Sequence, residues 1–163
     1  MSARREEAWD PTNPTTLVIA CSDGRFQEEL DDFLRSELGV RQYDRLYVPG
    51  GAGALSPSGI EFSRASTQRN ECRFLMEAHG ITRVILLVHG PAPDGPTTAT
   101  CGDYRRLFPD SSSQQIRAQQ AEDLAGILQD TMWSTVDVEV LRCEVDATGT
   151  VEFVRLGGTT RER

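Results

Sequence analysis

Lysine is absent from the sequence, and no apolar run reaches the length of a membrane-spanning helix. All 17 basic residues are arginines, and 25 acidic residues outnumber them, so the formal net charge is −8. An acidic chain without a basic stripe argues against nucleic acid or an anionic membrane as the main partner. Residues 1–14 also lack the apolar core of a signal peptide, so we expect a cytoplasmic protein.

Cysteine is scarce as well, with four residues in a chain of 163. Such wide spacing does not resemble a disulfide framework, so we expect metal ligands, nucleophiles or small buried side chains. The length suits one domain with its own core. We expect an N-terminal tail or arm over residues 1–14, one domain over 15–156 and a C-terminal tail over 157–163. Trp9 is a plausible anchor of the arm on a partner.

Two apolar runs, Thr16–Ala20 and Val84–Val88, are too short for buried helices and are bounded by turn residues. They predict strands buried on both faces of a parallel sheet. The shorter Asp44–Val48 alternates like an edge strand. Alternating residues over 136–154, with a turn near Gly149, predict a hairpin whose apolar phase slips at a bulge.

Helical spacing of apolar residues lies between these strands. We expect helices over residues 26–38, 58–79 and from the Ser111–Ser113 cap region to Leu128, with Gly39 and Gly80 as stop signals. Phe62 and Cys72 fall on the predicted apolar stripe of the second helix.

Strand–helix units followed by a hairpin predict a three-layer α/β fold. The apolar strands belong in its centre and the short strand at its edge, which gives a mostly parallel sheet of order 2-1-3-4. The hairpin adds an antiparallel fifth strand. The chain reverses direction between the first and third strands, so Cys21 and His89 flank the switch point where such folds bind ligands.

With Cys101 brought back by a loop, these residues form a Cys2His set with one position free. Zinc favours sulfur and nitrogen ligands, and catalytic sites leave the fourth position to water. Each residue also has a simpler interpretation, because a strand-end histidine is often structural and a lone cysteine is usually a small buried side chain. Cys72 and Cys143 fit that interpretation, whereas Cys21 and Cys101 adjoin loops at the same crevice.

Three segments together resemble the β-class carbonic anhydrases. Cys21–Arg25 matches the family's Cys-x-Asp-x-Arg motif after the first strand. Pro49–Gly53 is similar to its Ala-Gly turn, and Cys101–Tyr104 is similar to its Cys-Gly-x-Tyr segment. The resemblance runs from about Thr15 to Leu156.

The resemblance implies a zinc-dependent lyase that reversibly hydrates carbon dioxide to bicarbonate. It implies zinc bound by Cys21, His89 and Cys101, and Asp23 paired with Arg25 as catalytic residues, the carboxylate accepting a hydrogen bond from the bound water or, in closed members, binding zinc itself. Zinc would lower the pKa of that water from 15.7 toward ~7 and make hydroxide available to attack carbon dioxide. The implied pocket wall consists of Gly51, Ala52, Gly53 and Gly102. A homodimer or higher homo-oligomer acting on a small neutral substrate is expected, without nucleic acid or membrane.

One departure from the family is the segment Gly90–Thr100, because the family motif is His-x-x-Cys. A loop that leaves and re-enters the crevice preserves the ligand set. Pro91, Pro93 and Pro96 stiffen it against helix formation. We expect it to form a lid that narrows and dries the entrance.

Two other functions fit the residues. Relatives of the family hydrolyse carbonyl sulfide or carbon disulfide with the same ligands. A non-catalytic member, zinc-free or with Gly50–Gly53 cradling a nucleotide phosphate, is the other alternative. A lone glycine-rich turn is weak evidence, and no lysine or Ser/Thr follows it as in a P-loop. The spacing from Cys21 to Arg25 is also too short for the phosphate cradle of cysteine-dependent phosphatases.

Overall fold

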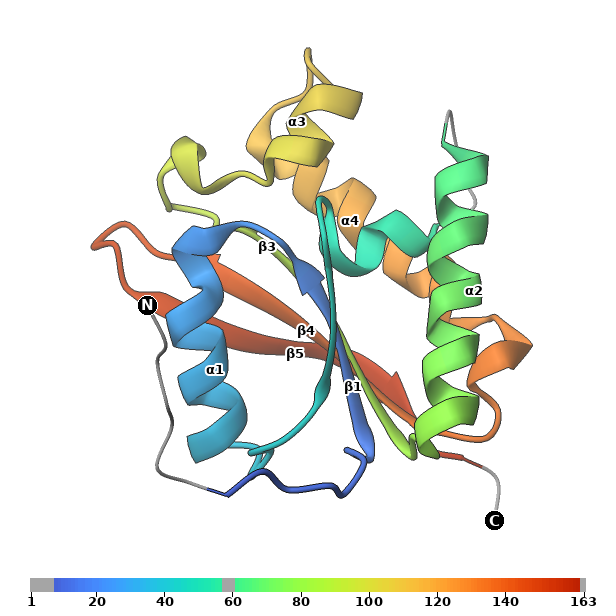
Figure 1. The fold of residues 1–163 in the computed structure, drawn as a ribbon. Helices are drawn as coiled ribbons and strands as arrows, with labels where there is room; N and C mark the ends of the chain where they lie inside the picture. The colour runs from blue at the N-terminus through green and yellow to red at the C-terminus, as the bar shows by residue number, and fades with distance from the viewer. Residues whose placement is uncertain (1–7, 57–60, 162–163) are drawn as a thin grey trace, which may run out of the picture.

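The computed structural model describes residues 8–56 and 61–161. Its five-stranded sheet has the order β2-β1-β3-β4-β5 (Figure 1). The strands are β1 (Thr16–Cys21), β2 (Asp44–Val48), β3 (Arg83–Pro91), β4 (Asp137–Val145) and β5 (Val151–Thr159). Neighbours are parallel except β4 and β5, which are antiparallel. The predicted fold class and strand order are therefore confirmed.

Four α-helices accompany the sheet in the described residues. They are α1 (Gln27–Ser36), α2 (Phe62–His79), α3 (Gly102–Leu107) and α4 (Ser113–Leu128). Short 3-10 turns are η1 (Gly24–Phe26), η2 (Gly51–Leu55), η3 (Thr97–Ala99) and η4 (Thr131–Trp133). α3 was not predicted, because this short helix contains charged residues after Tyr104 and no periodic pattern of apolar residues.

The helix ends follow local sequence signals. α2 ends before Gly80, whose φ of 67° suits glycine, as predicted. Ser112 and Gln115 form a reciprocal capping box at the start of α4. The predicted start of the second helix at Ser58 lies outside the described residues. Phe62 is 66% exposed and does not belong to the core stripe, which corrects that expectation.

Helices cover both faces of the sheet, so the fold has the three layers that the sequence predicts (Figure 1). One face packs on α1 and buries Val18, Ala20, Leu30, Leu34, Ile85 and Leu87. The other face packs on α2 and α4 and buries Leu17, Ile19, Cys72, Leu86, Leu124 and Ile127. Because both faces are covered, the central strands are apolar throughout rather than alternating.

The hairpin explains the slip of the apolar pattern. Val138 and Val140 pack on the α2 and α4 face, whereas Leu141 and Cys143 pack on the α1 face. The pairing register also shifts between Val140 and Leu141, as the predicted bulge requires. β5 continues to Thr159, so residues 157–159 belong to the sheet and not to the expected C-terminal tail.

The switch point opens where β1 leaves β3. The two strands pair only as far as Ile19 and Leu86, while β3 stays paired with β4 up to Pro91. His89 therefore lies within β3 and not at its end, which corrects the predicted boundary. Gly51 fills the opening at φ 59°, and a Cβ there would lie 2.5 Å from the Leu87 carbonyl oxygen and 2.8 Å from the Cys21 nitrogen.

In the part of the chain that the structure describes, none of the helices combines the length and the apolar character needed to cross a membrane.

Candidate metal centre

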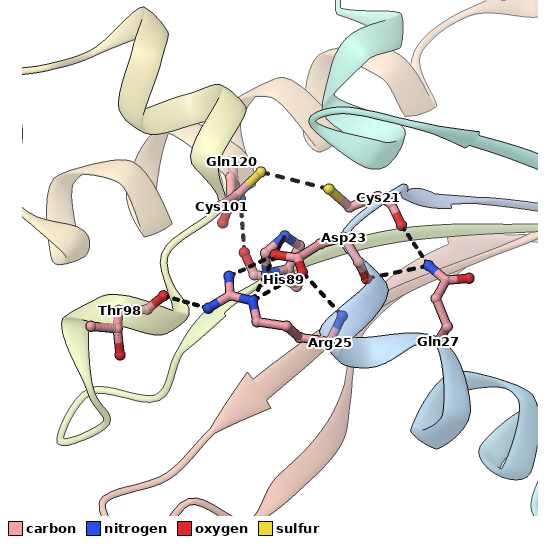
Figure 2. A network of polar contacts seen from close by, with 8 residues as sticks. All are labelled: Cys21, Asp23, Arg25, Gln27, His89, Thr98, Cys101 and Gln120. Carbon is pink, nitrogen blue, oxygen red and sulfur yellow. Dashed lines mark hydrogen bonds and ion pairs between the residues drawn. The ribbon is translucent and has the colours of Figure 1, made fainter.

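The structure brings Cys21, His89 and Cys101 together at the switch point (Figure 2). Cys21 is the last residue of β1, His89 projects from β3, and Cys101 is the N-cap of α3. One potential ligand atom from each residue lies within 4.8 Å of the others. The three residues predicted as zinc ligands therefore lie together in spite of the long Gly90–Thr100 segment between His89 and Cys101.

The chemistry of this cluster fits a metal ion. His89 is 1% exposed, and both of its ring nitrogens are buried without a hydrogen-bond partner among the described residues. An unsatisfied buried imidazole is costly unless it binds something. The two sulfurs are 4.0 Å apart, close to the ~3.8 Å expected for thiolates on one tetrahedral zinc ion.

The pKa values of the two thiols shift in opposite directions. The hydrogen bond from Cys101, followed by the effect of the nearby His89, lowers the pKa of Cys21 to about 4 against the opposing effect of burial. The same hydrogen bond, together with burial, raises the pKa of Cys101. One thiolate is therefore readily available, and binding of a cation would favour loss of the second proton.

Asp23 and Arg25 form a two-pronged ion pair beside the cluster (Figure 2). Arg25 Nε donates to Asp23 Oδ1 at 3.0 Å, and Nη2 donates to Oδ2 at 2.6 Å. These hydrogen bonds lower the pKa of Asp23 and raise that of Arg25. Asp23 Oδ2 lies 3.9 Å from His89 Nε2, so the carboxylate borders the ligand cluster while Arg25 holds it.

The insertion does not form the expected lid. Gly90 and Pro91 continue β3, and the Ala92 nitrogen donates to the Val145 carbonyl at 2.9 Å. Only its last turn, η3, borders the site, where the Thr98 carbonyl accepts a 3.0 Å hydrogen bond from Arg25 Nη1. The proline-rich middle packs against β4 and α4. Gln114 Nε2 at the start of α4 donates a 3.1 Å hydrogen bond to the Pro93 carbonyl, and Gly95 lies so close to the Val145 carbonyl that a Cβ would not fit. The insertion therefore braces Arg25 instead of covering the crevice.

The residues expected in the pocket wall have different surroundings. Gly51 sits in the fork between β1 and β3, and Ala52 is fully buried in the core. Gly53 makes room for the Tyr104 ring and lines a cavity of about 110 Å³. Gly102 lines an adjoining open depression beside the turn after β2, which shares Glu61, Arg64 and Asp103 with that cavity.

That depression is strongly charged. Its other lining residues are Pro49, Glu61, Arg64, Asp103 and Arg106. Arg64 Nη1 lies 2.8 Å from Glu61 and 2.9 Å from Asp103, and Arg106 bridges the same two carboxylates. A Cβ on Gly50 would lie 2.6 Å from Asp103 Oδ2. Asp103 therefore occupies the space beside the glycine turn, and Arg64 and Arg106 balance its charge and that of Glu61.

Sequence reasoning missed two contacts of the site. The Thr98 carbonyl is a main-chain group, so no residue type marks it. Gln120 donates a 3.1 Å hydrogen bond from Nε2 to the His89 carbonyl. A signal for it existed, because Gln120 interrupts the apolar stripe of α4 between Ile116 and Leu124.

Comparisons with known proteins were made for the whole chain. No family model matches it, and no curated protein sequence matches it. Among solved structures it is similar to a mutant of the β-carbonic anhydrase CafD of Aspergillus fumigatus, with 12% identity, 91% of each chain covered and a TM-score of 0.48. For β-carbonic anhydrase isoform I of Trichomonas vaginalis the identity is 10%, the coverage 93% of this chain and 88% of that chain, and the TM-score 0.48.

A third solved structure, the β-carbonic anhydrase CcaA, is 17% identical over 92% of this chain and 81% of that chain, with a TM-score of 0.47. All three belong to the family that the Cys21–Arg25 motif resembles. At these TM-scores the functional argument rests on the site itself.

Proposed function

We propose that this protein is a zinc-dependent lyase of the carbonic anhydrase type, which reversibly hydrates carbon dioxide to bicarbonate. The observation that carries the proposal is the cluster of Cys21, His89 and Cys101 ligand atoms within 4.8 Å of one another. Two thiols and an imidazole are a donor set that zinc favours, and three protein ligands leave a position for water. The Asp23 carboxylate beside them supplies the hydrogen-bond acceptor that orients the attacking water during hydration.

Each protein group has a distinct role in this proposal. Zinc, when bound, supplies the Lewis acidity that activates water near neutral pH. Asp23 stays ionised, because its pKa is lowered by Arg25, and can accept a hydrogen bond that orients the attacking oxygen. Arg25 keeps the carboxylate turned toward itself and away from the ligand position. Phe26, whose ring centroid is 4.5 Å from that of His89, shields the imidazole from water.

Proton release would use solvent or buffer. The protein has two histidines, and the second, His79, lies at the end of α2 with its Nδ1 2.6 Å from Asp44 Oδ2. It is therefore committed to another carboxylate and is not a shuttle for this site. The side chains of Asp23 and Arg25 are 18% and 56% exposed, so they mark the side from which solvent reaches the cluster.

The test is zinc content and hydration rate in matched cysteine variants. We expect one zinc per chain and carbon dioxide hydration in stopped-flow assays. Cys101→Ser should lose both, with activity falling to background. Cys143→Ser is the control, since Cys143 is equally buried but lies outside the cluster. Wild-type protein that binds no zinc would contradict the proposal.

Carbonyl sulfide and carbon disulfide are assayed on the same preparations. The sulfur analogues would use the same ligands, so hydrolysis of either without carbon dioxide hydration would replace the proposed substrate and keep the metal site. Loss of all three activities in zinc-loaded protein would leave the non-catalytic alternative.

We also propose that the active form is a homodimer. Trp9 is 86% exposed on the N-terminal arm, so its ring is available to a partner chain. Sedimentation at micromolar concentration should show a dimer, and Trp9→Ala should shift the equilibrium toward monomer. A wild-type monomer under these conditions would contradict this part of the proposal.

A further inference from the structure

A polar side chain occupies the middle of the apolar face of α4. Ile116, Leu124 and Ile127 on this face are buried against the core, as the helical period requires. Gln120 lies one helical turn from both Ile116 and Leu124 and is only 1% exposed. A buried amide is costly unless its donors and acceptors are used, so its partners indicate why it is there.

The amide of Gln120 contacts the strand that carries the candidate histidine ligand. Its Nε2 donates to the His89 carbonyl at 3.1 Å, as Figure 2 shows from close by. β3 has lost its β1 partner at this point, because the last β1–β3 pair is Ile19 with Leu86. Gln120 therefore restrains the main chain of β3 where the sheet no longer pairs on both sides.

The orientation of Gln120 is itself fixed. Arg142 Nη1 donates to Gln120 Oε1, which assigns the amide nitrogen to the His89 side. Arg142 is 2% exposed, and its Nε lies 3.0 Å from Glu144 Oε1. Gly90 makes room for this arginine, since a Cβ there would lie 2.5 Å from Arg142 Nη2. Gln120, Arg142 and Glu144 thus form a buried chain of contacts that ends at His89.

Such a chain is weak evidence of a role in global stability, because apolar side chains of similar volume often replace buried ion pairs without loss of stability. We propose that Gln120 is a positioning residue, which holds the His89 main chain so that the imidazole faces Cys21 and Cys101. The chain of Arg142 and Glu144 keeps its amide in the donating orientation. The consequence for metal binding rests on the proposed function, whereas the positioning of His89 does not.

The experiment compares Gln120→Glu and Gln120→Met with the control Gln119→Met. Glutamate keeps the size and the contact with Arg142 but, when ionised, has no donor for the His89 carbonyl. Gln119 is the neighbouring glutamine, and its amide donates to Asp123 instead, at 3.1 Å. Zinc release to a chromogenic chelator should be about 10- to 100-fold faster in both Gln120 variants, the size of effect typical of groups that orient ligands.

A second measurement does not depend on metal. Selective isotope labelling of histidine gives two sets of NMR signals, from His79 and His89, because the chain has two histidines. In metal-free protein, both Gln120 variants should shift the His89 carbonyl signal and broaden its ring signals, with His79 unchanged as an internal reference.

These outcomes separate the two proposals. Unchanged His89 signals in both Gln120 variants, or changes of equal size in Gln119→Met, would overturn the positioning role. Absence of zinc from the wild-type protein, together with His89 shifts in the Gln120 variants, would support the positioning role and contradict the proposed enzyme. The positioning role would also be overturned if zinc release became faster and the metal-free protein lost thermal stability while the His89 signals did not shift.

Discussion

Cys21–Arg25 and His89–Cys101 supply the two halves of the candidate metal centre, and different kinds of contact hold them. The first half is held locally. Asp23 caps η1 by accepting a hydrogen bond from the Arg25 nitrogen, and Gln27 Nε2 donates to the Cys21 carbonyl at 3.1 Å. The arrangement of these side chains depends mainly on their spacing in the sequence.

The second half is held by distant parts of the chain. Gln120 restrains His89, and the buried hydroxyls of Thr100 and Ser113 are 2.8 Å apart just before Cys101. The Thr98 carbonyl in turn accepts a hydrogen bond from Arg25. Tertiary contacts therefore bring Cys101 to Cys21 and His89 across the long Gly90–Thr100 segment, without a short motif that joins His89 to Cys101.

The largest effect is expected from the local half. Arg25→Ala should leave zinc bound but lower carbon dioxide hydration at least about 10-fold, because hydrogen bonds between charged groups contribute about 1.5–3 kcal/mol. Without the guanidinium, Asp23 is free to turn toward the open ligand position. Stopped-flow hydration and zinc content measure the two effects separately.

The control for that variant is Arg35→Ala, which removes an exposed arginine of α1 that lies 3.5 Å from Asp32. It should retain wild-type zinc content and turnover. Wild-type turnover in Arg25→Ala would show that the Asp23 carboxylate needs no partner. The local contact between Asp23 and Arg25 would then have no role in hydration.

A smaller effect is expected from the distant half. Replacing residues 97–99 by three glycines should loosen η3, which carries the Thr98 carbonyl. Glycine has more conformational freedom than other residues, so ordering this turn costs more entropy. Hydration should fall about 3- to 10-fold with zinc retained, the equivalent of about one hydrogen bond. Hydration rates and zinc content are measured together.

The control replaces Pro93 and Asp94 by glycine, since this part of the insertion lies against β4 and α4. It should leave turnover within about twofold, because such surface changes are normally within ~0.5 kcal/mol. A rise in carbon dioxide hydration in either variant would support the lid interpretation, because it would show that the segment restricts access to the site. Loss of zinc from the variant at residues 97–99 would show that η3 helps to hold the zinc ligands in place.

Much of the fold follows from patterns in the chain. The apolar runs of β1 and β3 predict central strands, and the alternation of residues in the hairpin predicts the antiparallel end of the sheet, because burial on one or both faces fixes each pattern. The strand order then follows from the handedness of parallel crossovers. The sequence alone therefore places Cys21 and His89 at the switch point.

The sequence alone determined the strands, their order and the chemistry of the ligand set, because these depend on periodicity and residue type within short segments. The structure shows Cys101 beside Cys21 and His89, as expected from the sequence, but only the tertiary structure decided that Thr98 and Gln120 support Arg25 and His89. The contacts of Thr98 and Gln120 join residues that are far apart in the chain, and both use a main-chain carbonyl, which every residue type possesses. No local pattern encodes which distant partner such a group will meet.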